Sequence, residues 1–373
     1  LFAASPGMET SRNFAAKQFT SLSNAPGQKP GAFCCSNFSM NPEALTLDTV
    51  RQAHARIAGG LRPTPSAVST PLSELAGMGI ILKHDYQQAT GSFKERGARN
   101  ALLSLTPEQR VRGVVAASAG NHALGLAYHG AQLGVDVTVV MPLNAPLVKA
   151  QRCRELGARV VQHGRTYDES AGFAVSLATQ QQATYVHPFD DLAVIAGQAT
   201  LALEALYAFP DADAFVVPVG GGGLLAGVAT VVRSLRPDAL VIGVEPAHAP
   251  SLAVSLGAGR PVRVPVSASL ADGLAVAQTG ETTFALAKRF VDRVVTVTED
   301  EIAVAILRLH ETEDAVIEGA GAAGLAACLA GKLPELTGKR VVLPLTGRNI
   351  DPAVHARARC RARAALGETA LVA

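Results

Sequence analysis

The stretch Thr90-Gly91-Ser92-Phe93-Lys94-Glu95-Arg96-Gly97-Ala98 places a lysine directly after a glycine-containing turn and at the start of an expected helix. The apolar run 79–83 before it has the length and composition of a short buried strand. Backbone amides at a helix start carry partial positive charge, which helps to lower the pKa of a nearby amine. Lys94 is therefore a candidate nucleophile, although a solvated surface lysine could have the same local sequence.

Two further turns join an expected strand to an expected helix. Ser118-Ala119-Gly120-Asn121-His122 follows the apolar run 111–116, and Gly220-Gly221-Gly222-Gly223 follows 214–219. The free amides of the first turn could bind a substrate carboxylate, and Asn121 could donate to a phenolate oxygen. Ser and Asn are also ordinary helix caps, and His122 fits a structural hydrogen-bonding role better than that of a base. Consecutive glycines let backbone N–H groups converge on a phosphate.

Taken together, these features predict a lysine Schiff base to a phosphorylated aldehyde, for which pyridoxal 5'-phosphate is the candidate cofactor. A dinucleotide site is the competing interpretation. Gly221, Gly223 and Ala226 follow the G-x-G-x-x-A spacing, and Glu245 ends the next strand about 20 residues further on. The dinucleotide interpretation leaves the first two turns without a function.

Two single residues are also candidates for the site. Thr346 follows the last expected strand, so its hydroxyl could meet a pyridine nitrogen, although it could equally belong to a simple turn. Glu318 could be a buried functional carboxylate or only an acid in the first turn of a helix.

The composition is that of an α/β enzyme. The 373 residues are 48% hydrophobic, mainly Ala, Val and Leu, and the net charge of +2 indicates neither nucleic acid nor an anionic membrane as a partner. The uncharged run 214–232 is interrupted by Pro218 and four glycines, which argues against a transmembrane helix. Five scattered cysteines fit free thiols better than disulfides or a zinc site: Cys34, Cys35, Cys153, Cys328 and Cys360.

Apolar periodicity predicts alternating strands and helices from about residue 43. The expected strands are 79–83, 111–116, 135–141, 158–162, 214–219, 239–244 and 340–345. The expected helices are 45–57, 94–105, 121–133, 146–156, 166–181, 196–208, 224–235, 281–290, 300–310 and 319–331. This alternation implies right-handed crossovers and parallel strands. Two successive series predict two lobes, with a ligand cleft at the carboxyl ends of the strands.

At these motifs the chain resembles the fold-type II pyridoxal-phosphate enzymes, and among them the threonine dehydratase (threonine ammonia-lyase) and serine racemase branch. The resemblance runs from about residue 45 to 355 and rests on TGSFKERGA (90–98), SAGNHA (118–123), VGGGGLLAG (219–227), ADG (271–273), TEDEI (298–302) and IEGAGA (317–322). It implies an α/β, tryptophan-synthase-β-like fold with two parallel-sheet lobes and the cofactor in the cleft between them. The large domain would comprise 43–111 plus 191–355, and the small domain 112–190.

The resemblance also implies residue roles. Lys94 would hold the cofactor as a Schiff base, Phe93 would pack beside it, and Asn121 would bond its ring hydroxyl. Its phosphate would lie on Gly220, Gly221, Gly222 and Gly223, and its pyridine nitrogen would meet Thr346. The substrate carboxylate would lie on the loop of Ser118, Ala119, Gly120, Asn121 and His122.

The implied activity is deamination of L-threonine, and of L-serine, to a 2-oxo acid and ammonia. Three positions depart from the family pattern. Ala119 stands where serine racemases usually carry a second serine, which favours dehydration over racemisation. Ser251 replaces an acid of the cation site that Glu245 and Ala249 would share, so no metal is expected. Arg348 replaces a flexible glycine, and the sequence does not explain it.

Several alternatives stay open at this point. They are a dehydratase of 3-hydroxyaspartate or phenylserine, a serine racemase-like enzyme, an NAD-dependent oxidoreductase, and a non-catalytic relative that binds the cofactor. A homodimer or homotetramer is expected from the resemblance. Residues 1–42 have the composition of a disordered extension or of an organelle transit peptide, which leaves the localisation open. Residues 356–373 are expected to form a tail, too short for the regulatory domain of some relatives.

Overall fold

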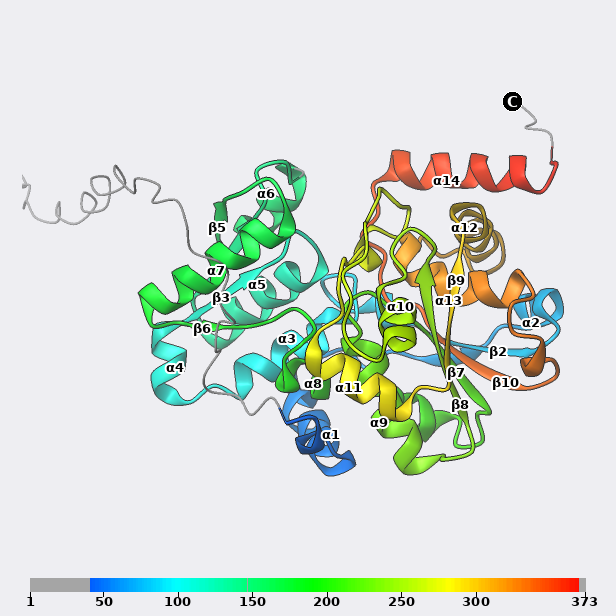
Figure 1. Cartoon of the computed structure of the whole chain (residues 1–373), viewed down its shortest axis with the longest axis horizontal. Coiled ribbons are helices and arrows are strands. Elements are labelled where there is room, and N and C mark those ends of the chain that lie inside the picture. Colours follow the sequence, from blue (N-terminus) through cyan, green and yellow to red (C-terminus); the bar gives the residue numbers. More distant parts are fainter. Residues whose placement is uncertain (1–40, 146, 369–373) are drawn as a thin grey trace, which may run out of the picture. The chain divides into compact units, whose positions relative to one another are not determined.

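The computed structural model describes residues 41–145 and 147–368, which form two sheets and the helices around them (Figure 1). The predictions for residues 1–42 therefore fall almost entirely outside the described residues. Within the two described ranges, no helix is both long enough and apolar enough to cross a membrane.

The larger sheet has six strands. Their order is β1 (Ser66–Val68), β2 (Gly79–Lys83), β10 (Arg340–Pro344), β7 (Ala214–Pro218), β8 (Leu240–Pro246) and β9 (Arg293–Val297). Every neighbouring pair is parallel except β1 with β2. Because side chains alternate across a strand, Phe215 and Val217 of β7 enter one core while Ala214 and Val216 enter another. Helices must therefore cover both faces of this sheet.

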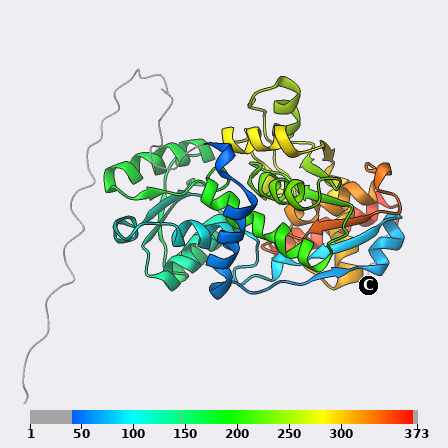
Figure 2. The same cartoon turned by 90° about the horizontal axis from the view of Figure 1, so that it is seen from below.

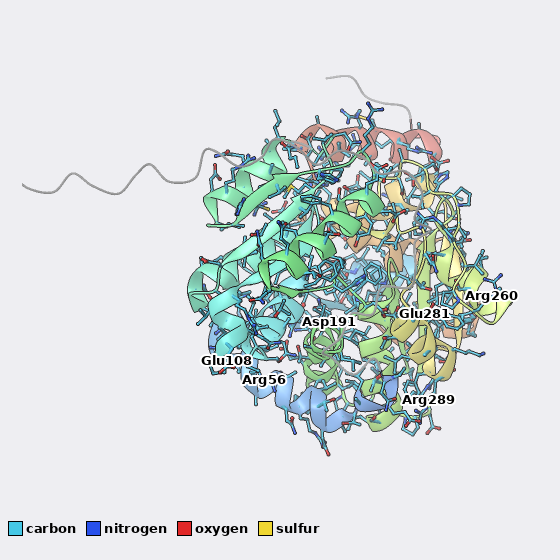
Figure 3. All side chains as sticks on the ribbon, turned by 60° about the vertical axis from the view of Figure 1, so that its left-hand side comes forward. Arg56, Glu108, Asp191, Arg260, Glu281 and Arg289 are labelled. Carbon is cyan, nitrogen blue, oxygen red and sulfur yellow. The ribbon has the colours of Figure 1, made fainter. Side chains whose placement is uncertain are left out.

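The two faces are covered by different helices. One core joins the sheet to α8 (Leu192–Ala208) and α9 (Gly223–Leu235), and the other joins it to α12 (Glu299–Glu313) and α13 (Gly319–Leu329). The remaining helices of this lobe are α1 (Leu47–Ile57), α2 (Thr70–Ala76), α10 (Ser251–Ala258), α11 (Glu281–Phe290) and α14 (Pro352–Ala365). Arg56 on α1, labelled in Figure 3, donates to Asn100 Oδ1 at 2.6 Å and so ties α1 to the helix that Lys94 opens.

The smaller sheet has four parallel strands in the order β5 (Arg159–Gln162), β4 (Val137–Met141), β3 (Val114–Ala117) and β6 (Thr184–Tyr185). One core joins β3 and β4 to α3 (Lys94–Leu103), α5 (Asn121–Leu133) and α6 (Leu147–Glu155). The opposite core joins the same strands to α7 (Tyr167–Gln181). Figure 2 shows this sheet and its helices beside the larger sheet. The two-lobed, parallel-sheet α/β fold is confirmed, while the domain boundaries near 112 and 190 stay predictions.

The element predictions are correct for the strongly periodic segments. Helices 121–133 and 281–290 and strand 79–83 have the expected bounds. The strand expected from Val111 was wrong at its start, because Val111 lies in α4 (Pro107–Arg112) and β3 begins after Gly113, whose φ is +74°. No strand was predicted at β1, β6 or β9, although β9 has the valine-rich sequence RVVTV.

Helix α14 occupies most of the segment expected to be a tail. His355, Ala358 and Ala362 are its buried residues, and Ala362 packs in one cluster with Ala303 and Leu307 of α12. Because this buried stripe is made largely of alanine between arginines, it gives almost no hydrophobic periodicity.

Candidate active site

Three neighbouring strands of the large sheet deliver the main candidate residues to one edge. β2, β10 and β7 are adjacent and parallel, so the segments that follow them leave at the same end of the sheet. These segments carry Lys94, Thr346 and the four glycines. The segments that carry Lys94 and Thr346 are joined directly, because Phe93 N donates to Thr346 O at 2.9 Å and Ser92 forms a β-bridge with Gly347.

Lys94 is the first residue of α3 and is partly buried. Its Nζ donates to the Pro188 carbonyl oxygen at 2.8 Å and lies 5.3 Å from the Phe93 ring centroid. Burial lowers the pKa of Lys94 to about 8, against the opposing effect of the Glu318 carboxylate. The amine is therefore far more available as a nucleophile than an exposed lysine, through burial rather than through the helix-start amides expected from the sequence, and its role as the nucleophile stays a prediction.

Two neutral histidines share the surroundings of Lys94. Burial and the Lys94 charge lower the pKa of His122 to about 3 and that of His187 to about 4. His187 Nδ1 accepts from Asp190 N at 2.9 Å, which orients its ring. The His122 ring is buried, and in the described part of the chain neither of its nitrogens has a partner in hydrogen-bond geometry.

The glycine loop is shaped for an anion. Gly222 has a φ of +94° and precedes α9 without any side-chain cap. A Cβ on Gly221 would overlap the Phe189 ring, and one on Gly223 would lie 2.6 Å from the Phe189 carbonyl oxygen, so side chains are excluded at both positions. Free amides at a helix start on a side-chain-free loop are what a phosphate group requires. Gly220 to Gly223 therefore fit the phosphate of the expected cofactor.

A chain of short hydrogen bonds lies beside these groups. Asn121 Nδ2 donates to Glu318 Oε1 at 2.7 Å, and Asn349 Nδ2 donates to Asn121 Oδ1 at 2.7 Å. Burial and the nearby Asp272 raise the pKa of Glu318 to about 7. A Cβ on Gly347 would overlap Glu318 Oε1, so this glycine is needed for the carboxylate to sit here. Glu318 is thus a buried carboxylate at the N-cap position of α13 and in contact with Asn121, and its functional role stays a prediction.

The loop expected to hold the substrate carboxylate follows β3. Ser118 Oγ accepts from Gly120 N at 3.2 Å, and Gly120 precedes α5 without a side-chain cap. Ser118, Ala119 and Gly120 are each partly exposed. The loop thus presents a helix start next to Asn121, and its role in holding a substrate stays a prediction.

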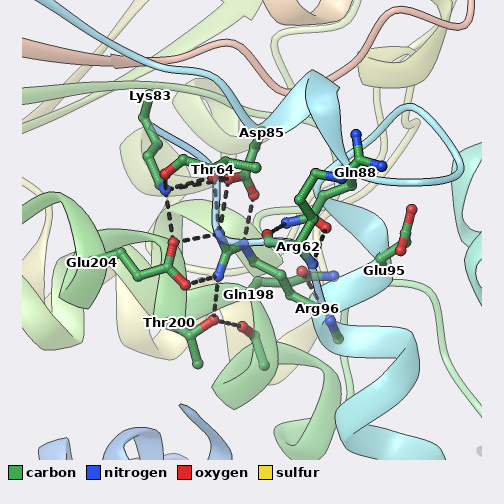
Figure 4. Close-up of polar contacts among 12 residues, drawn as sticks. Arg62, Thr64, Lys83, Asp85, Gln88, Glu95, Arg96, Gln198, Thr200 and Glu204 are labelled. Carbon is green, nitrogen blue, oxygen red and sulfur yellow. Dashed lines mark hydrogen bonds and ion pairs between the residues drawn. The ribbon is translucent and has the colours of Figure 1, made fainter. Parts of the chain in front are cut away.

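Beneath Lys94, α3 is anchored by a buried ion cluster that the sequence did not predict (Figure 4). Arg96 Nε lies 2.6 Å from Asp85 Oδ2, and its Nη1 lies 2.7 Å from Glu204 Oε1. Lys83 Nζ donates to Glu204 Oε2 at 2.7 Å and to Thr64 Oγ1 at 2.6 Å. Two cations and two carboxylates therefore balance, and they hold the first turn of α3 against β2 and α8.

Glu245, the acid required by the dinucleotide interpretation, is used within the fold. Its Oε1 accepts from Leu252 N at 2.7 Å and its Oε2 from Ala253 N at 2.9 Å, so it caps α10. Burial raises the pKa of this carboxyl to about 7. The Ala249 carbonyl oxygen, at the second position of the cation site that some relatives have, accepts from Ser251 N at 2.9 Å. A ribose hydroxyl would have to displace the cap of α10.

The structure also adds residues to the site that the sequence did not single out. Pro188 and Phe189 come from the segment after β6, and Asn349 lies three residues after Thr346, with no role expected for it from the sequence. Of these three residues, only Asn349 lies close in sequence to a residue that was singled out, Thr346. Pro188 and Phe189 reach Lys94 and the glycines only through the path of the chain between the lobes.

Known proteins give independent information on this arrangement. Residues 57–347 match the family described as pyridoxal-phosphate dependent enzyme. An L-threonine ammonia-lyase from Thermotoga maritima is 46% identical over 307 residues, which cover 82% of this chain and 76% of that protein.

Two solved structures share the fold. The processed form of threonine deaminase isoform 2 from Solanum lycopersicum has a TM-score of 0.79 at 34% identity, covering 85% of this chain and 94% of that one. A serine racemase from Dictyostelium discoideum has a TM-score of 0.78 at 37% identity, covering 82% and 99%.

Proposed function

Because the chain belongs to the pyridoxal-phosphate dependent enzymes, we propose that it is an ammonia-lyase that converts L-threonine to 2-oxobutyrate and ammonia. The observation that carries this proposal is the partly buried Lys94, whose pKa is lowered to about 8, at the same sheet edge as the uncapped glycine loop. Identities of 46% and 45% to two L-threonine ammonia-lyases support the reaction class.

Different residues of the site would hold different parts of the cofactor. Lys94 would bind it covalently, Phe93 would pack beside it, and Asn121 would donate to its ring oxygen. Gly220 to Gly223 would hold its phosphate, and the buried Thr346 would offer a neutral hydroxyl to its ring nitrogen. When bound, pyridoxal phosphate supplies a carbonyl carbon for the substrate amine and delocalises negative charge from the α-carbon.

Lys94 is also the proposed base. With its amine free, Lys94 would take the proton from the substrate α-carbon. With a pKa of about 8, roughly a tenth of the amine is neutral at pH 7, against less than about a thousandth for an ordinary lysine. Burial lowers the pKa of His122 to about 3 and that of His187 to about 4, so both rings are neutral near pH 7. Both are much weaker bases than the Lys94 amine.

Finer features of the function are part of the same proposal. L-serine differs from L-threonine by one methyl group, and a pocket discriminates a methylene by only about 1–3 kcal/mol, so both are substrates. Ala119, partly exposed beside Asn121, offers no hydroxyl for reprotonation from the opposite face, so racemisation is the minor outcome. The working form is a homodimer or homotetramer.

The decisive experiment combines the colour of the protein with product release. Purified protein loaded with pyridoxal phosphate is expected to show a visible band that changes on adding L-threonine, together with release of 2-oxobutyrate. Lys94→Ala is expected to lose turnover, whereas Lys339→Ala, a matched change at an exposed lysine, keeps it.

Other outcomes would redirect or overturn the proposal. A coloured protein that is inert to threonine but releases product from 3-hydroxyaspartate or phenylserine would move the substrate assignment. A coloured protein inert to all of these would be a binding relative without turnover. Full activity in Lys94→Ala, or a protein that takes up no cofactor, would contradict the central claim.

A further inference from the structure

We infer that Asn349 is a positioning residue that sets the direction of the Asn121 side-chain amide, so that one Asn121 N–H is left for an anionic oxygen in the site. The inference rests on the proposed function, because the oxygen it serves is the ring oxygen of pyridoxal phosphate. Asn349 does not itself contact the cofactor in this proposal, and acts only through Asn121.

The direction of the Asn349 amide is determined by its two other neighbours. Its Nδ2 donates to the Thr90 carbonyl oxygen at 2.8 Å, and a carbonyl oxygen can only accept. Its Oδ1 accepts from Arg152 Nη1 at 3.0 Å, and a guanidinium can only donate. Turning the amide over would set oxygen against oxygen on one side and N–H against N–H on the other. Asn349 therefore presents N–H, and not oxygen, to Asn121.

The orientation of the Asn349 amide in turn determines the orientation of the Asn121 amide. Since Asn349 Nδ2 donates to Asn121 Oδ1 at 2.7 Å, the Asn121 oxygen is occupied and its Nδ2 must face the other way. One of the two Nδ2 hydrogens goes to Glu318 Oε1 at 2.7 Å. Among the residues that the structure describes, the second hydrogen has no acceptor, and an amide N–H is the group that stabilises a phenolate-type oxygen.

Two glycines make room for this series of hydrogen-bonded side chains, one at each end. Gly91 has a φ of +84°, and a Cβ there would lie 2.8 Å from Asn349 Oδ1. A Cβ on Gly347 would overlap Glu318 Oε1 and lie 3.2 Å from Asn121 Nδ2. These hydrogen bonds connect three segments that lie far apart in sequence: α6 supplies Arg152, α5 supplies Asn121, and the loop after β10 supplies Asn349.

The direct test is Asn349→Asp in the protein loaded with pyridoxal phosphate. The aspartate has nearly the same shape but cannot donate to Asn121 Oδ1, so the Asn121 N–H is drawn away from the ring oxygen. The visible band belongs to the form with negative charge on that oxygen, and the near-ultraviolet band to the form with a neutral hydroxyl. We expect their intensity ratio to fall by about tenfold, the effect of one hydrogen bond to a charged group. A loaded Asn349→Asp protein with an unchanged ratio would overturn the inference.

A second pair of variants covers the case in which Asn349→Asp fails to fold or to hold the cofactor. Arg152→Glu replaces a donor by an acceptor at the exposed end of the chain and is expected to lower the ratio in the same direction, by a smaller factor. Arg154→Glu makes the same charge reversal on the same helix, at an exposed residue outside the chain, and is expected to leave the ratio unchanged. Equal ratios in the two variants would refute the inference. Failure of the proposed function itself is distinct, because it would appear in the parent protein, either as the lack of both bands or as a loaded protein that releases no 2-oxobutyrate from L-threonine.

Discussion

At the scale of single residues, the site is governed by the charge balance between Lys94 and Glu318. Burial lowers the pKa of Lys94 to about 8 and raises that of Glu318 to about 7. Each group moves toward its neutral form, because a low-dielectric pocket disfavours both charges. Glu318 opposes the shift of Lys94, since a nearby negative charge favours the ammonium form.

This balance predicts the pH dependence of the free amine. In cofactor-free protein, reductive methylation of Lys94 should rise with pH to a midpoint near 8, because only the neutral amine reacts. In Glu318→Gln the midpoint should fall below that value, since the charge that favours the ammonium form is gone. Mass spectrometry of the Lys94 peptide measures both curves, and an exposed lysine such as Lys339 serves as the internal reference. A midpoint that rises in Glu318→Gln would reverse the assigned sign.

At the scale of helices and strands, three helices that open at the site begin without a cap from the side chain of the preceding residue, a feature they share with α10, α11 and α13. Phe93, Gly120 and Gly222 precede α3, α5 and α9 without a side-chain cap. By contrast, Thr or Asp side chains cap the starts of α1, α4, α7, α8, α12 and α14. Uncapped amides are available for a ligand, so the helix starts at the site keep their hydrogen-bonding capacity for the cofactor and substrate.

The glycine loop gives the test at this scale. Gly223→Ala should weaken binding of pyridoxal phosphate by about 10- to 100-fold, because the new methyl group must push the loop off the Phe189 carbonyl oxygen and displace amides that bind a charged group. Titration of the visible band gives the dissociation constant. Gly257→Ala is the matched control, since a Cβ there meets no atom within 4 Å. Equal affinity in both variants would exclude the loop as the phosphate site.

At the scale of the whole molecule, the buried cluster of Lys83, Asp85, Arg96 and Glu204 links the end of β2 to α3 and α8 (Figure 4). Asp85 and Arg96 are fully buried. Removing one partner from such a cluster leaves an uncompensated charge in the interior, whereas the intact cluster adds little net stability over a well-packed apolar core. Its value here is to hold the turn of α3 from which Lys94 projects.

Arg96→Met should therefore lower the free energy of unfolding by about 3–5 kcal/mol. Adding Glu204→Gln should recover part of this loss, because it removes the excess negative charge that remains when Lys83 alone faces Asp85 and Glu204. Urea unfolding of the cofactor-free protein measures both variants. Arg51→Met, which breaks an exposed pair with Asp48, should cost less than about 1 kcal/mol. A loss of that small size for Arg96→Met would show that the cluster is not a structural anchor.

Local sequence alone determined the elements with strong periodicity and the residues at strand-to-helix turns. Helix 121–133, strand 79–83, Lys94 and the four glycines were all predictable, because each depends on its immediate neighbours in the chain. Alanine-rich α14 was not, since its buried face carries too little apolar signal, and β9 was missed although its sequence RVVTV is rich in valine.

Only the tertiary structure decided which distant groups meet. Pro188 reaches Lys94, Arg152 reaches Asn349, and Asn349 reaches Asn121 across separations that no local pattern encodes. The lowered pKa of Lys94 also depends on burial, which follows from the packing of both lobes around it. Periodicity and turn chemistry act over a few residues, whereas desolvation and hydrogen-bond direction depend on every group that the fold brings within contact.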